Sequence, residues 1–137
     1  MMIFMFVSLK PLALFAAAAS VCICGFAAEI TPQTQAEVEQ LLSRLASSGC
    51  QFQRNGSWHD GAEARSHIER KYRYGLKKHM VGTTEDFIAM AATESSMSGK
   101  PYAVKCPNQE QVSSAQWMNA QLKQLRGGGK SAAARQP

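Results

Sequence analysis

The 137-residue sequence lacks the short motifs that mark most enzymes and metal sites. It has no glycine-flanked serine of the G-x-S-x-G type, which a nucleophile elbow requires. Its histidines (His59, His67 and His79) are not spaced for a zinc site, and no C-x-x-C pair accompanies them. The common zinc and serine-hydrolase patterns are therefore excluded, and the sequence predicts no metal and no cofactor.

Charged side chains are nearly absent from the first 28 residues, which contain a single lysine among apolar and small residues. An apolar run that ends in small residues is typical of a secretory signal peptide. Gly25 and Ala27 stand at the −3 and −1 positions of a G-x-A cleavage site. The sequence therefore predicts that residues 1–27 are removed and that the mature chain begins at Ala28, in the periplasm or outside the cell.

Two other interpretations of this segment stay open. Residues 11–28 could remain as a membrane anchor, although this run is barely long enough for a bilayer, which takes about 20 residues. Cys22 or Cys24 could carry a lipid, although the residues before them fit a lipidation signal poorly. Cleavage is favoured, and no stable membrane span is then expected in the mature chain.

Cysteine is scarce in the rest of the chain, where only Cys50 and Cys106 follow the predicted signal peptide. Two thiols in a small exported domain indicate one disulfide, because an oxidising compartment favours the bond. Closing a loop of this length stabilises a domain by about 4 kcal/mol in the chain-entropy model. The sequence therefore predicts a Cys50–Cys106 disulfide.

Acidic side chains are absent after Glu110, whereas four basic ones follow it. All ten acidic residues and ten of the 15 basic residues lie between positions 28 and 110, so this part of the chain is formally neutral. A basic tail on a neutral body is a poor indication of nucleic-acid binding, and export would separate the protein from nucleic acid. We therefore predict no nucleic-acid partner.

Apolar residues recur at helical spacing in four segments, each preceded by a capping residue. Asn55-Gly56 favours a tight hairpin turn, so we predict strands at 50–54 and through Trp58, and another at 102–106. This order indicates an α+β domain of about four helices on a two- or three-stranded antiparallel sheet, with one disulfide. The capping residues are Thr31, Asp60 with Glu63, Thr83 or Thr84, and Ser113 with Gln116.

Helix ends are also indicated by the sequence. The helix that begins after Asp60 is predicted to run to about His79, with His79 on its core face. Gly127-Gly128-Gly129 are predicted to end the last helix. We therefore expect one domain over residues 28–126 and a flexible basic tail over residues 127–137.

Three segments together carry a family resemblance: GCQFQRNGSWHDGAEARSHIERKYRY, TTEDFIAMAATESSMSGKPYAVKC and SAQWMNAQLKQLR. In them the chain resembles the YfeK-like family of small bacterial periplasmic proteins, from roughly Ile30 to Arg126. The resemblance implies an envelope location and a disulfide-linked α+β domain. It implies no activity, because the family has no established one, and the Gly-rich basic tail extends past the part that matches.

One face of the helix after Asp60 carries the candidate ligand-binding residues, spaced 4, 3 and 4 residues apart beside the core face. Ammonium groups with a phenol and an imidazole can hold a phosphate or carboxylate. Alternatively, the lysines only cover the core with their stems and keep their charged heads in water. The sequence predicts a non-catalytic binding module for an anionic envelope component or a protein partner. The candidates are His67, Lys71, Tyr74 and Lys78, together with Arg54 and Lys100.

A small periplasmic hydrolase is the alternative function. His67 could serve as the base for a serine among residues 95–98, with an acidic residue to orient the imidazole. The glycine and proline around this loop already account for its serines as turn residues. No catalytic residue is therefore assigned, and Trp58 and Trp117 are candidate anchors for a protein partner.

Overall fold

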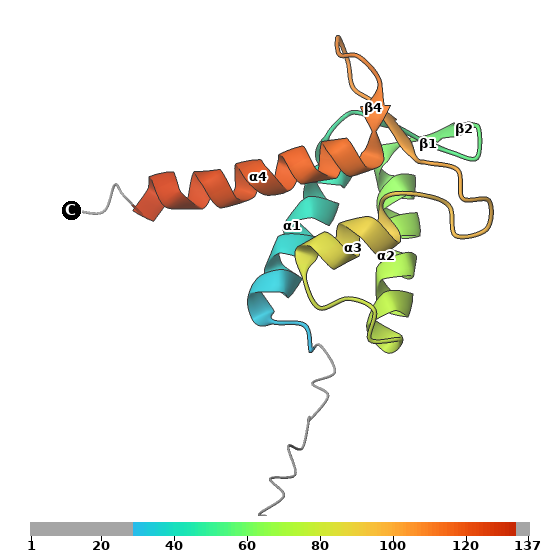
Figure 1. Cartoon of the computed structure of the whole chain (residues 1–137). Helices are drawn as coiled ribbons and strands as arrows, with labels where there is room; N and C mark the ends of the chain where they lie inside the picture. Colours follow the sequence, from blue (N-terminus) through green and yellow to red (C-terminus); the bar gives the residue numbers. More distant parts are fainter. Residues whose placement is uncertain (1–28, 134–137) are drawn as a thin grey trace, which may run out of the picture.

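The computed structural model describes residues 29–133, so the predicted signal peptide and residues 134–137 lie outside the described residues. Helices α1, α2 and α3 pack together, α4 crosses them, and the sheet lies at one end (Figure 1). The domain is therefore α+β, as the sequence predicts. The elements are α1 (Pro32–Ser47), β1 (Gln51–Arg54), β2 (Ser57–His59), α2 (Gly61–Lys77), α3 (Thr84–Ala91), β3 (Ala103–Lys105), β4 (Val112–Ser113) and α4 (Ser114–Ala133).

The helices begin at the expected capping residues. Thr31 caps α1 by accepting a hydrogen bond from the Thr34 N–H, and Thr83 caps α3 in a reciprocal box with Asp86. Asp60 caps α2, but only half of the expected box forms there. The Glu63 carboxylate turns instead to His59, whose Nδ1 lies 3.2 Å from Oε2. A contact between the His59 and Glu63 side chains at the edge of the sheet thus replaces the second capping bond.

Helix α2 starts in close contact with the end of α1. A Cβ at Gly61 would lie 2.5 Å from the Leu45 carbonyl oxygen and 2.8 Å from that of Ala46. Only glycine allows the two backbones to approach so closely. This contact fixes where α2 begins, and therefore where its side chains lie relative to the sheet.

The sheet is antiparallel, with the order β2-β1-β3-β4. Asn55 and Gly56 have positive φ values of 49° and 84°, so the predicted hairpin turn between β1 and β2 is confirmed. In the register, Phe52 pairs with His59 on one side and with Val104 on the other. Because side chains alternate across a strand, Phe52 and Arg54 share the face of the sheet that meets the helices.

The sheet has four strands where the sequence predicts two or three. The fourth, β4, contains two residues, and Ala103 pairs with Ser113 across it. Two residues are too few to leave an alternating pattern, so the sequence gives no sign of this strand.

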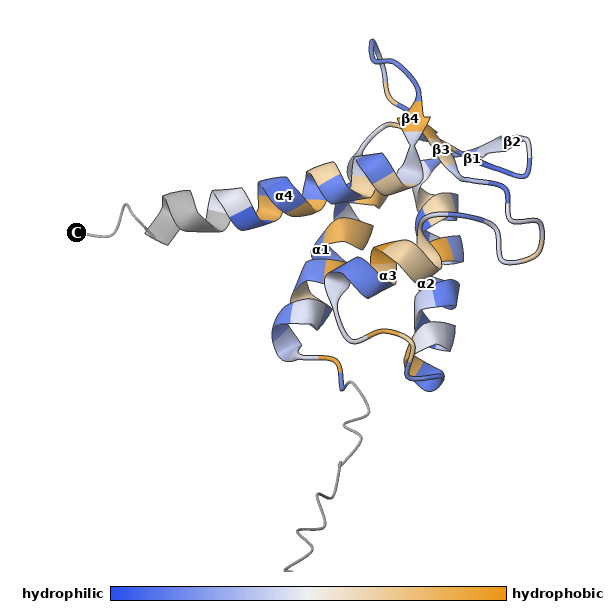
Figure 2. Cartoon of the chain, in the orientation of Figure 1, coloured by the Kyte–Doolittle hydropathy of each residue, from blue (hydrophilic) through white to orange (hydrophobic). Residues whose placement is uncertain are grey.

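The core lies where α1, α3 and the first half of α4 meet the inner face of the sheet. Figure 2 shows the apolar residues of these helices turned toward one another and the polar ones turned outward. Trp117 is only 9% exposed and packs edge-on against Phe52, at 5.6 Å between ring centroids. Of the two candidate anchors for a partner, Trp117 is therefore a core residue, whereas Trp58 remains 38% exposed.

The Cys50–Cys106 disulfide is present and joins the chain just before β1 to the chain just after β3. It therefore crosslinks two neighbouring strands at the same end of the sheet. The predicted pairing of the cysteines is confirmed.

Two helix ends differ from the prediction. Helix α2 ends at Lys77, and His79 has a left-handed φ of 53° and is exposed, so its assignment to the core face was wrong. Helix α4 does not end at Gly127 but continues to Ala133. Within the part of the chain that the structure describes, no helix is long and apolar enough to span a bilayer.

Candidate ligand-binding site

A pocket of about 310 Å³ lies between α2 and the inner face of the β1–β2 hairpin. Its apolar side is formed by Phe52, Ala64 and Ile68. Its polar side comes from four different elements and from Tyr102, the residue before β3. The polar lining residues are Gln53, Arg54, His59, Glu63, Ser66, His67, Arg70, Tyr102 and Ser114.

A chain of hydrogen bonds runs along the polar side of the pocket. Arg54 Nη1 lies 2.7 Å from His67 Nδ1, and His67 Nε2 lies 2.9 Å from the Tyr102 hydroxyl. Lys71 Nζ approaches the same hydroxyl at 3.5 Å and donates to the Glu94 carbonyl oxygen at 2.7 Å. Three side chains from α2 and β1 are thus gathered around Tyr102.

The direction of each bond in this chain is fixed by the chemistry of its ends. Arginine and lysine only donate, so His67 Nδ1 must accept and the imidazole hydrogen must lie on Nε2. His67 Nε2 then donates to the Tyr102 oxygen, which also accepts from Lys71. The Tyr102 hydroxyl hydrogen has no acceptor among residues 29–128, whose side chains the structure describes, so Tyr102 and Arg54 both offer donors to the pocket.

The electrostatics of the site agree with this assignment. Burial, followed by the positive charges of Arg54 and Lys71, lowers the pKa of His67 from 6.5 to about 4. Burial also raises the pKa of Tyr102 above 10, which keeps its hydroxyl protonated at neutral pH. Burial lowers the pKa of Lys71, against a smaller opposing effect of Glu94. The imidazole is thus neutral and able to accept from Arg54.

Ser114 adds an unusual group to the pocket. This first residue of α4 is 1% exposed, and its backbone N–H donates to the Tyr102 carbonyl oxygen at 2.9 Å. Its Oγ is buried and has no hydrogen-bond partner among the described residues. Buried hydroxyl groups are nearly always hydrogen-bonded, so this one lacks a partner that such a group usually has.

The structure brings together three of the six candidate residues and separates the others. Arg54, His67 and Lys71 meet around Tyr102, whereas Lys78 Nζ lies over the exposed Tyr74 ring, 5.9 Å from its centroid. His67, Lys71 and Tyr74 also line a second hollow of about 300 Å³ beside α3. Lys100 is exposed, and its side chain makes no hydrogen bond or ion pair with the other five candidates in the described structure.

The hydrolase alternative gains no support from this geometry. The hydrogen-bond partners of the His67 ring nitrogens are Arg54 and Tyr102, and no serine of residues 29–128 is among them. Ser95 is buried and its Oγ accepts from Asn55, while Ser98 donates to the same asparagine. These serines hold the loop against the hairpin turn.

Tyr102 and Ser114 were missed as site residues, although the sequence contains a signal for Tyr102. If a disulfide joins Cys50 to Cys106 across two antiparallel strands, a residue that follows Cys50 lies opposite the residue that precedes Cys106 by the same number of positions. Four steps from the disulfide place Tyr102 opposite Arg54, consistent with the observed pairing of Phe52 with Val104. No comparable signal exists for Ser114, because its position depends on the two-residue strand β4.

A family described as "Family of unknown function (DUF5329)" matches residues 32–126. The chain belongs to this family. The matched segment begins at the first residue of α1 and ends within α4, so it includes both cysteines and every residue of the pocket.

A relative confirms the resemblance to YfeK-like proteins. Over 76 residues the chain is 36% identical to "Uncharacterized protein YfeK" of Salmonella typhimurium strain LT2. The match covers 55% of this chain and 62% of that relative, and no solved structure matches the chain. Within the described residues, no group of three or more histidine, cysteine or acidic side chains is placed to hold a metal ion.

Proposed function

We propose that this protein is a non-catalytic binding module whose pocket between α2 and β1 holds a small anionic ligand. The observation that carries the proposal is the directed chain from Arg54 through His67 to Tyr102. Every polar group in this hydrogen-bonded network either donates or already accepts a hydrogen bond. The network therefore offers free donors, and a bound ligand must supply the acceptor. A carboxylate or phosphate is the ligand group that such a site favours.

The compartment is part of the same proposal. The disulfide supports an oxidising compartment, and together with the apolar N-terminal sequence it favours the bacterial envelope. The anionic ligand would then be an envelope component. A pocket of about 310 Å³ is at the small end of ligand sites, so it suits a small molecule or one group of a larger one.

The test is an anion titration of protein purified after export from a bacterial host. Acetate, benzoate and inorganic phosphate are added separately while backbone NMR shifts of residues 52–54, 102 and 114 are followed. Arg54→Gln should weaken binding at least about tenfold, because hydrogen bonds to charged groups contribute about 1.5–3 kcal/mol. Lys77→Gln is the matched control, since it removes the same charge from an exposed position at the end of α2.

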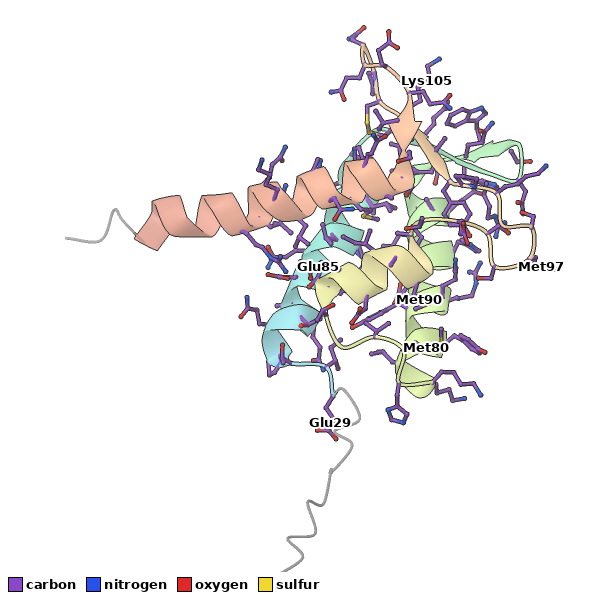
Figure 3. The ribbon with its side chains drawn as sticks, viewed as in Figure 1. Glu29, Met80, Glu85, Met90, Met97 and Lys105 are labelled. Carbon is purple, nitrogen blue, oxygen red and sulfur yellow. A yellow bond between two sulfur atoms is a disulfide. The ribbon has the colours of Figure 1, made fainter. Side chains whose placement is uncertain are left out.

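Equal binding by wild type and Arg54→Gln would contradict the proposal. A protein partner is the other outcome to watch for, because Met97 is 98% exposed at the tip of an ordered loop (Figure 3). A partner recovered from envelope extract whose retention requires Met97 and not Arg54 would replace the small-ligand site with a protein interface.

A further inference from the structure

The proposed anion site leaves open which anion it accepts, and the pocket itself narrows the choice. Resting on that proposed function, we infer that the ligand is a monocarboxylate with an apolar body and one uncharged hydrogen-bonding group that reaches Ser114. Three features support this class of ligand: the net charge of the pocket lining, the planar guanidinium of Arg54, and the apolar residues and Ser114 in the rest of the pocket.

The charge of the lining suits a single negative charge. Arg54 and Arg70 face the pocket, and Glu63, beside His59, is its acidic residue. With His67 neutral, the lining carries one positive charge in excess. A monoanion would neutralise this charge, whereas a phosphate dianion would leave a negative charge beside Glu63.

The free part of Arg54 has the geometry of a carboxylate receptor. Nη1 is occupied by His67 Nδ1, but a guanidinium has five N–H donors in a planar fork. The donors that His67 does not use can pair with both oxygens of a planar carboxylate. The Tyr102 hydroxyl hydrogen supplies a further donor close to His67.

The rest of the pocket describes the body of the ligand. Phe52, Ala64 and Ile68 are buried apolar residues that favour an aromatic or aliphatic group. Ser114 is 1% exposed, and its Oγ has no partner in the described chain. A hydroxyl or similar group on the ligand would give Ser114 its missing hydrogen bond.

The test compares five small probes on protein purified after export: benzoate, benzamide, 3- and 4-hydroxybenzoate, and inorganic phosphate. Benzoate should bind more tightly than benzamide and phosphate, and this preference should be lost in Arg54→Gln. One of the hydroxybenzoates should bind about two- to tenfold more tightly than benzoate, the range expected of one neutral hydrogen bond.

Ser114→Ala should abolish the advantage of the hydroxyl group, so that in this variant the favoured hydroxybenzoate binds no more tightly than benzoate. Ser57→Ala is the matched control, because Ser57 is an exposed serine of β2 outside the pocket lining, and it should keep the advantage. If Ser114→Ala does not fold, nuclear Overhauser contacts in wild type decide instead. The ring hydrogens of the bound hydroxybenzoate should contact Ala64 and Ile68, and their absence would contradict the inference.

The remaining outcomes separate this inference from the proposed function. Phosphate that binds as tightly as benzoate and requires Arg54 would overturn the carboxylate class but keep the anion site. A hydroxyl advantage that survives Ser114→Ala would overturn the role of Ser114. Failure of every probe to bind in an Arg54-dependent way would overturn the proposed function itself, and this inference with it.

Discussion

His67 sets the direction of the whole polar network, because a neutral imidazole has one donor and one acceptor nitrogen. Arg54 takes the acceptor, which leaves the donor for Tyr102. Protonation would set an imidazolium against a guanidinium at 2.7 Å, so the network exists only while the imidazole is neutral. The protonation state of this one ring therefore decides whether the polar network forms.

This dependence predicts how acid affects the protein. The pKa of His67 in the folded state is about 4, against an ordinary value of 6.5. Between these values the unfolded chain binds the proton more tightly, so stability is complete above pH 6.5 and decreases as the pH falls toward 4. His67→Gln should lack this part of the pH dependence, as measured by chemical unfolding at pH 7 and pH 4.5.

An NMR titration provides the check at a single residue. The His67 ring resonances should change with a midpoint near pH 4. A midpoint above 6 would show that the imidazole is not held in the neutral form. Glu37, whose pKa Arg126 lowers to about 2, loses its contribution only below pH 4.5, so the two residues act in largely separate ranges.

Sequence reasoning identified Arg54, His67 and Lys71 but not the hydroxyl that joins them. Helical spacing places side chains on one face of a helix, but it does not say which neighbours cover that face. Lys71 reaches Tyr102 because the residue before β3 lies beside this turn of α2. Tyr74, one turn further along α2, is 57% exposed. The elements that pack over α2, and not the helical spacing, therefore separate His67 and Lys71 from Tyr74 and Lys78.

At the scale of elements, one arginine ties the last helix to the two helices beneath it. Arg126 donates to both oxygens of Glu37, at 3.0 and 2.9 Å, and also to Glu85 at the start of α3. Glu37 is 9% exposed and accepts a further bond from Thr84. The segment matched by the family ends at this arginine.

Loss of this contact should loosen α4. Arg126→Ala would leave the largely buried Glu37 carboxylate without its cation. We expect the free energy of unfolding to fall by about 1–3 kcal/mol. This is less than the loss of one partner costs in a fully buried ion pair, because Arg126 is partly exposed. Urea unfolding gives the free energy of unfolding for each variant. Lys123→Ala, an exposed lysine on the same helix, should change it by less than about 0.5 kcal/mol. Equal effects of the two changes would contradict the role given to Arg126.

Helix starts were more predictable than helix ends in this chain. Threonine, aspartate and serine caps are read from single residues, and Thr31, Asp60 and Thr83 occupy the expected positions. The end of α2 depends on His79, a non-glycine residue in a left-handed conformation, which the sequence does not mark. Gly127 carries a helix-breaking signal that the structure does not follow, and its intrinsic preference is only about 1 kcal/mol.

At the scale of the whole molecule, the disulfide and the pocket are linked through the same two strands. The bond joins β1 and β3, and these strands lead directly to Arg54 and Tyr102. Sequence reasoning could supply the bond, the hairpin and the fold class. It could not supply the pocket, because Ser114 enters through the fourth strand and the start of α4.

Removal of the disulfide should therefore affect stability and binding together. The double change Cys50→Ala and Cys106→Ala should lower the free energy of unfolding by about 2–5 kcal/mol. Benzoate binding should weaken under conditions where the variant is still folded, because the two strands are no longer held in register. Reduction of the wild type should reproduce both effects, and unchanged binding in the reduced, folded protein would show that the strand pairing alone maintains the pocket.

The disulfide also makes chain length a determinant of the site. Arg54 and Tyr102 each stand four residues from a bonded cysteine, one after it and the other before it. Insertion of a single residue in either segment would turn the pocket residue beyond it to the opposite face of the sheet. A substitution at the exposed residue Gln51 leaves this spacing intact. The two segments between the disulfide and the pocket thus have the same fixed length. The pocket can tolerate a substitution within either segment more readily than an insertion or deletion.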